Sequence, residues 1–486
     1  MICEDGDALA RLAGTNDAYR DPSEAAVSQA CDLAARRERI MFGYLRGQLA
    51  MIVNFAIYYS LFSPVASALA GVSGVGQGRS AYSVSIAIFQ PIAGVLAERI
   101  SMRSILISVF VIRALIWAAI VPSAFFLLGE SASFLTVFIA LMFVDGAVVS
   151  IGSLVDIDEG GVDILGQQHG FVVDDALRNR YNTIYDGCSS LSRVLMAPLM
   201  AAVGVFAAGI LSSATAALVL VMAMSFLLPA IVGSYYYFRY IPGQAHLPER
   251  SVEQTLLTET VDIARGLWSG MRLAWSEERV RWRMGLNAAE RAIEDTMLLI
   301  VLAEFAMKVL APSNIAMGAL YTAILIAVGK LGALPAAWAM HRYWQAPGAG
   351  DPKLPGYKIF FPLAFGGTLA TTLIPVSVMV AQSGYFWSAA ALAGISAILF
   401  NLLFTASALG FRNLMQGIVS EVGASGRLFG IQGTFMMGFS ALAILALSAL
   451  FERMDLLTAF TVTSVVYVFY GGVQLIIGKR LLFPDE

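Results

Sequence analysis

The sequence predicts an all-α polytopic membrane protein with twelve transmembrane helices in two six-helix bundles. Of its 486 residues, 58% are hydrophobic and only 13% are charged, which is too little charge for the surface of a soluble protein. Apolar segments near the roughly 18–20 residues that a helix needs to cross a bilayer recur along the whole chain. A membrane β-barrel would instead show short alternating segments.

The predicted spans fall into two sets of six on either side of a long polar segment. They cover residues 47–70, 80–98, 104–127, 133–155, 184–209, 214–238, 288–311, 315–340, 358–381, 386–411, 428–450 and 456–478. We therefore divide the chain into an N-terminal tail (1–46), a first bundle (47–240), a linker (241–287) and a second bundle (288–486).

Lys and Arg residues predict the orientation. They gather in the loops of one side, at residues 36–46, 99–103, 178–180, 239–283, 342–358, 412–427 and 479–480. The opposite loops hold little beyond Arg79, Lys308 and Arg453. By the positive-inside rule, both termini and the linker are cytoplasmic, at the inner membrane if the cell is bacterial.

The linker predicts an amphipathic helix at the cytoplasmic face. Trp268, Met271 and Trp275 are spaced to share one side of a helix, and Arg265 and Arg272 lie on the other. We expect its role to be structural, joining the two bundles.

Ionisable residues inside the spans are candidate transport residues, because a charge in hydrocarbon is costly unless it has a partner, water or cargo. Arg113 and Asp145 lie at nearly equal depth in spans three and four, which predicts a buried pair, structural or functional. Glu294 and Asp295 in span seven match Lys330 in span eight, so one carboxylate is in surplus and available for a proton or a cation. Alternatively, span seven begins later and both acids are hydrated.

An acidic loop follows span four. Asp156, Asp158 and Asp163 surround a Gly160-Gly161 turn. Because carboxylate oxygens are the ligands that hard divalent cations prefer, we expect this loop to hold a metal ion.

The loop after span two resembles the signature loop of the major facilitator superfamily. It reads Gly94-Val-Leu-Ala-Glu98-Arg99-Ile-Ser-Met-Arg103, with Glu98 in place of the family's Asp and Met102 in place of a Gly. The resemblance implies the family's fold and alternating access. It also implies that Gly94, Glu98, Arg99 and Arg103 lock the cytoplasmic side in the outward-facing state.

Two further segments are similar to ferroportins. These are Asn182-Thr-Ile-Tyr-Asp186 with Leu195-Met-Ala-Pro198, and the stretch 416–432. The resemblance implies export of a divalent metal and makes Asn182 and Asp186 candidate transport residues. The chain departs from the pattern, because span one lacks an acid and no cysteine follows Cys188.

No motif of an enzyme or of a cofactor site is found: the sequence lacks a P-loop, a Gly-x-Ser-x-Gly elbow and an HExxH motif. With a net charge of −3 and scattered basic residues, no nucleic-acid partner is predicted. We expect a secondary transporter that exports a divalent cation such as iron. The alternatives are a proton-coupled exporter of a small organic molecule and a non-transporting receptor or assembly factor. Aromatic side chains facing the cavity would favour organic cargo, and convergent carboxylates would favour metal.

Overall fold

The computed structural model describes residues 24–97, 100–127, 131–153, 161–211, 213–243, 256–344, 359–422 and 425–478. Its regular structure is helical. The first half contains α2 (Glu24–Ala97), α3 (Met102–Leu127), α4 (Ser131–Ser153), α5 (Gly161–His169), α6 (Asp175–Leu211), α7 (Ala214–Ser225) and α8 (Ser234–Tyr240). The second half contains α9 (Leu256–Ser276), α10 (Glu278–Thr296), α11 (Leu302–Phe305), α12 (Ile315–Trp344), α13 (Phe360–Ala370), α14 (Leu373–Gln382), α15 (Phe386–Val422), α16 (Ser425–Arg453) and α17 (Leu456–Val473).

Helix α2 contains the first two predicted spans. At Gly71 the backbone has φ 64° and ψ −157°, a conformation that is essentially restricted to glycine, and the chain turns back there. Tyr59, before this turn, and Arg79, after it, are hydrogen bonded to each other (3.0 Å), so the two arms of α2 run antiparallel.

Within the described residues, ten helices are long and apolar enough to span a membrane. One of them is α2, which holds two spans. The seventh predicted span corresponds to the segment from α10 to the π-helical turn at Ala306–Leu310. This segment is not among the ten apolar helices because it contains too many charged residues. Each of the twelve predicted segments is therefore helical over most of its described residues.

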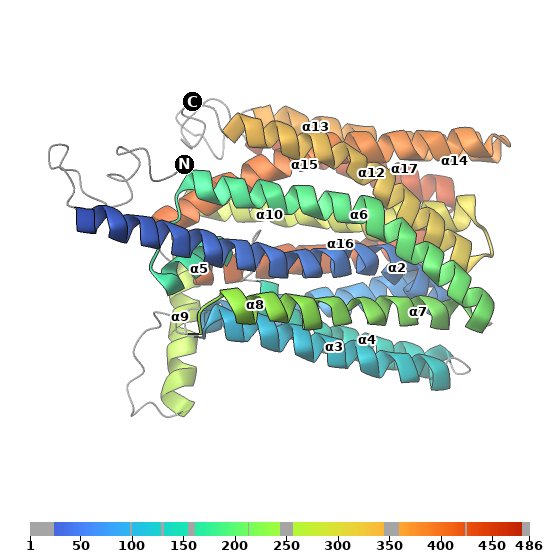
Figure 1. Ribbon diagram of the computed structural model, residues 1–486. Helices are drawn as coiled ribbons and strands as arrows, with labels where there is room; N and C mark the ends of the chain where they lie inside the picture. Colours follow the sequence, from blue (N-terminus) through green and yellow to red (C-terminus); the bar gives the residue numbers. More distant parts are fainter. Residues whose placement is uncertain are drawn as a thin grey trace.

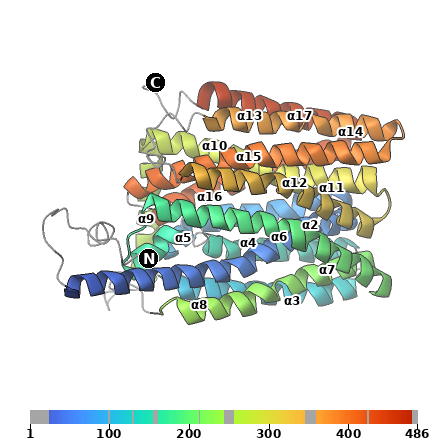
Figure 2. The same cartoon turned by 45° about the horizontal axis from the view of Figure 1, so that its top comes forward.

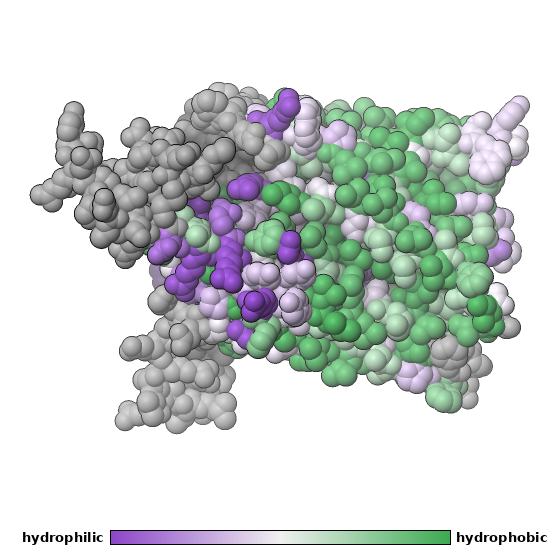
Figure 3. All heavy atoms as spheres, viewed as in Figure 1, coloured by the Kyte–Doolittle hydropathy of each residue, from purple (hydrophilic) through white to green (hydrophobic). Residues whose placement is uncertain are grey.

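The spans run side by side, and α9 lies across one end of them (Figures 1 and 2). We call this end the α9 end. Figure 3 shows a largely hydrophobic surface along the spans, with hydrophilic residues gathered towards the α9 end. Such an apolar band is suited to contact with lipid.

The predicted linker helix is present as α9, but its apolar side faces away from the bundle. Trp268, Met271 and Trp275 are 70%, 54% and 64% exposed, whereas Gly270 and Ala274 are buried. The small residues allow α9 to pack closely, and the tryptophans are left at the surface.

The two halves meet where α2 packs on α16 and α6 packs on α12. Towards the α9 end, the Thr434 hydroxyl donates to the Ala87 carbonyl (3.0 Å), and a side chain at Gly430 would lie 2.9 Å from a backbone oxygen of α2. Towards the other end, the Ser80 hydroxyl donates to the Ala441 carbonyl (3.0 Å). The second arm of α2 thus follows α16 closely on both sides of the molecule's middle.

Candidate functional site

A cavity of about 130 Å³ lies between the two halves, near the middle of the spans. Helices α2, α4 and α6 line it from the first half, and α10, α12, α15 and α16 line it from the second. Both halves therefore touch anything bound there, which is the arrangement that alternating access requires.

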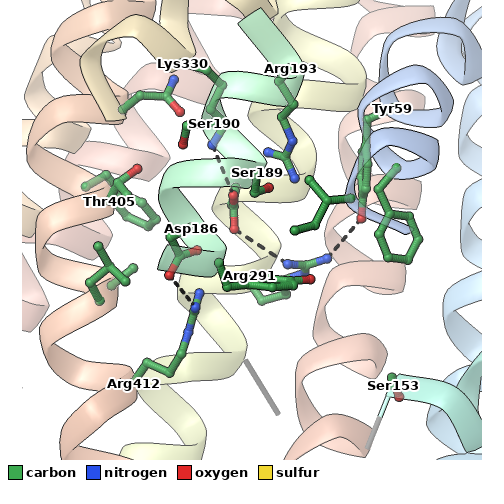
Figure 4. A pocket seen from close by; sticks show the side chains of 18 of the residues that line it. Tyr59, Ser153, Asp186, Ser189, Ser190, Arg193, Arg291, Lys330, Thr405 and Arg412 are labelled. Carbon is green, nitrogen blue, oxygen red and sulfur yellow. Dashed lines mark hydrogen bonds and ion pairs between the residues drawn. The ribbon is translucent and has the colours of Figure 1, made fainter. Parts of the chain in front are cut away.

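Charged side chains converge on this cavity (Figure 4). The basic ones that line it are Arg79, Arg193, Arg291, Lys330 and Arg412, and the acidic ones are Asp186 and Glu294. Asp295 lies directly behind them and is 1% exposed. With five bases and three acids, the site has an excess of two positive charges.

The acids of span seven are shared among several cations. Lys330 Nζ lies 3.6 Å from Glu294 Oε1, and Arg291 Nη1 lies 3.6 Å from Glu294 Oε2. Asp295 Oδ2 lies 3.4 Å from Arg291 Nε and 3.5 Å from Arg79 Nη2. The predicted matching of these acids with Lys330 is correct for Glu294, but the expected surplus of carboxylate is wrong because two arginines also contact them.

Sequence reasoning missed both arginines for identifiable reasons. The charge pattern places Arg79 in an outer loop, but the second arm of α2 begins at Gly71 and carries Arg79 into the bundle, where it is 1% exposed. Arg291 lies three residues before Glu294 and four before Asp295. Residues at this spacing form ion pairs on one face of a helix, so the sequence could have predicted these contacts.

Tyr59 is the point where three arginines meet. Arg79 Nη2 and Arg291 Nη2 both donate to its phenolic oxygen, each at 3.0 Å. The Arg193 guanidinium lies 5.4 Å from the centroid of its ring. We call Tyr59, Arg79, Arg193 and Arg291 the Tyr59 cluster. Figure 4 labels three of its members, Tyr59, Arg193 and Arg291.

Asp186 forms an ion pair that crosses between the halves. Its Oδ2 accepts a 2.8 Å hydrogen bond from Arg412, so α6 is tied to α15 at the wall of the cavity. Asn182, one turn earlier on α6, is fully buried and does not belong to the cavity lining.

Arg113 and Asp145 form the predicted pair. Two hydrogen bonds join them, at 2.8 and 3.1 Å, and the Trp117 indole donates a third to Asp145 at 3.3 Å. The two charged side chains are 3% and 0% exposed and do not line the cavity. This pair supports the helices behind the site.

The metal site expected in the loop after span four is not supported at Asp163. Its carboxylate accepts two hydrogen bonds from the buried Arg178 (2.8 and 3.2 Å), which occupies the oxygens that a metal would need. Asp156 and Asp158 lie outside the described residues. Among the described residues, no group of three or more His, Cys, Asp or Glu side chains is placed to hold a metal ion.

Part of the signature loop is described. A side chain at Gly430 of α16 would lie 3.4 Å from the Gly94 backbone, so these two glycines permit the close crossing of the halves at the α9 end. Arg103 donates to the Ile241 carbonyl (3.4 Å) and lies over the ring of Phe238 (4.2 Å). Glu98 and Arg99 lie outside the described residues.

Comparisons with known proteins rest on structure alone. No family model and no curated protein matches the sequence. Among the solved structures that match are the following three, each covering 90% of this chain and nearly all of its own. The human organic anion transporter MFSD10 is 15% identical over 99% of its chain (TM-score 0.52). The E. coli xylose transporter XylE is 13% identical over 98% (0.58), and the nucleoside transporter NupG is 13% identical over 99% (0.53).

These likenesses confirm the predicted fold, which is that of major facilitator transporters. The structural matches extend over both halves of the chain, as expected from the resemblance of the loop after span two to the major facilitator superfamily. The ferroportin resemblance gains no support from them.

Proposed function

We propose that this protein is a secondary transporter that moves a small organic anion across the membrane by alternating access. The observation that carries the proposal is the charge of the cavity between the halves, where five basic side chains outnumber the acids. In a site shielded from water, an uncompensated positive charge is costly and strongly favours an anion.

The aromatic lining favours an organic cargo over a bare ion. Tyr82 and Tyr185 line the cavity from the first half, and Phe400 and Phe404 line it from the second. Phe400 and Phe404 are stacked, with ring centroids 4.8 Å apart. Such surfaces pack against carbon skeletons, while a few polar groups orient the ligand.

The same charges argue against export of a divalent metal. A metal cation entering this cavity would be repelled by Arg193 and would have to compete for carboxylates already shared among arginines and a lysine. The geometry of the cavity therefore favours transport of a small organic molecule, the alternative given in the sequence analysis, over export of a divalent cation.

Glu294 supplies a way to couple cargo to protons. It is partly exposed to the cavity and neutralises Lys330 and Arg291 when no cargo is present. A cargo anion competes with Glu294 for these cations, and protonation of Glu294 releases them. Anion binding and proton uptake then favour each other.

The test is uptake into proteoliposomes of purified protein. We expect accumulation of a labelled aromatic acid such as benzoate, stimulated by a pH gradient, and no uptake of glucose or Co²⁺. Arg193→Gln should lower anion uptake about tenfold, whereas Arg342→Gln, at an exposed arginine outside the cavity, should not. Uptake of Co²⁺ without any anion would overturn the proposal.

A further inference from the structure

We infer that the Tyr59 cluster receives the acid end of the cargo and that it selects a compact dianion, such as a phosphate monoester, over a monocarboxylate. This inference rests on the proposed anion transport and specifies the cargo's chemistry. Its basis is the hydrogen-bond and charge balance of the cluster.

Tyr59 has a hydrogen to donate. Its phenolic oxygen accepts from Arg79 and from Arg291, which uses both lone pairs. Its own O–H has no acceptor among the described residues. The side chain is only 7% exposed and lines the cavity, so its acceptor comes from within the cavity, as water or as a bound molecule, and an anion is the stronger acceptor of the two.

The arginines of the cluster add further donors. Nε and Nη1 of Arg79 are buried and have no hydrogen-bond partner in the part of the chain that the structure describes. Arg193 has no carboxylate within salt-bridge distance in the described part of the chain and is held against the Tyr59 ring instead. An oxygen-rich anion would satisfy these groups together, because guanidinium N–H groups and a phenol O–H bind the same kind of acceptor.

The charge balance sets the preferred valence of the anion. Arg79, Arg193, Arg291 and Lys330 carry four positive charges. All but Arg193 contact one or both of two acids, Glu294 and Asp295. The pair Asp186–Arg412 is neutral by itself. With Glu294 and Asp295 ionised, two positive charges remain beside Tyr59, and a dianion neutralises both, whereas a monoanion leaves one buried and uncompensated. When Glu294 is protonated, three remain, and a dianion still offsets more of them than a monoanion.

Binding at this place also joins the halves. Tyr59 and Arg79 belong to α2 and Arg193 to α6, while Arg291 belongs to α10 of the second half. An anion held by all of them links the two halves through one ligand, which favours the closed cavity over either open form.

The experiment measures binding of phenyl phosphate and benzoate to purified full-length protein by calorimetry. Phenyl phosphate should bind at least about tenfold more tightly at pH 7.5. Because the second pKa of a phosphate monoester is about 6, its affinity should fall between pH 7.5 and 5.5 relative to that of benzoate. Phthalate, a compact dicarboxylate dianion, distinguishes a need for two charges from a need for phosphorus.

Variants test the assignment of residues. Tyr59→Phe, which keeps the ring, should weaken phenyl phosphate binding about tenfold, and Arg193→Gln should remove the preference for dianions. Tyr385→Phe, at an exposed tyrosine, is the matched control. Melting curves establish that each variant is folded.

The outcomes separate the two proposals. Equal affinities for benzoate and phenyl phosphate, or unchanged binding in both folded cluster variants, would overturn this inference and leave anion transport standing. If the wild-type protein neither binds nor transports any of these anions, the proposed function itself fails.

Discussion

At the scale of single residues, the spans hold two kinds of charge that look alike in the sequence. Arg113 and Asp145 satisfy each other behind the cavity, whereas Arg79, beside Tyr59, keeps two donors without a partner among the described residues. Asp145→Asn should therefore lower the free energy of unfolding by about 3–5 kcal/mol, because it leaves Arg113 buried without its counter-ion. The loss is measured as a fall in melting temperature in detergent.

The double variant Arg113→Met/Asp145→Leu should recover much of that stability, because it removes both charges together. Glu452→Gln, at an exposed acid, is the control. Equal melting temperatures for Asp145→Asn and the control would show that the pair contributes little.

At the scale of helices, Asp186 and Arg412 join α6 to α15 across the two halves. If these helices separate during transport, neutralising the pair should make the cavity more accessible. We expect Asp186→Asn to raise the labelling rate of a cysteine at Ser189, which lines the cavity, by about threefold to tenfold. Labelling uses a membrane-impermeant thiol reagent in a background that lacks Cys3, Cys31 and Cys188.

The exchange of charges, Asp186→Arg with Arg412→Asp, should return the labelling rate towards that of the parent. An unchanged rate in Asp186→Asn would mean that the pair does not hold the helices together. Arg342→Gln again serves as the matched loss of one positive charge.

At the scale of the whole molecule, the halves touch on both sides of the cavity, and transport requires each set of contacts to open in turn. At the end opposite α9, a side chain at Gly76 would lie 2.8 Å from Ser448 Cβ. A disulfide needs about 3.5–4.5 Å between the two Cβ atoms, so the helices have to part by roughly 1 Å to admit one. With that adjustment, cysteines at these two positions, in the background without native cysteines, should form a disulfide on mild oxidation. Anion transport should then fall about tenfold or more and return on reduction, as uptake assays would report.

Ser448→Cys alone should transport normally before and after oxidation. Gly76→Cys alone, which crowds Ser448, is the control for that change in packing, and its transport should not respond to oxidation. Full transport by the cross-linked protein would show that this end stays closed throughout the cycle.

The sequence by itself determined the properties that depend on local order along the chain. Hydropathy determined the twelve spans, because every backbone group in hydrocarbon must be bonded within a helix. The rise per residue of a helix determined that Arg113 and Asp145 lie at the same depth in the membrane, where they form an ion pair. The spacing of residues in the linker determined that α9 is a helix.

Only the tertiary structure decided the site. Tyr59 and Arg291 are 232 residues apart, and their contact depends on how each helix is rotated about its axis and packed against the other half. Hydropathy does not report that rotation. Arg79 lies inside the bundle because the second arm of α2 begins at Gly71, before the start of the predicted second span. The cavity's charge is a sum over side chains from both halves, so its positive sign became visible only when the helices were placed together.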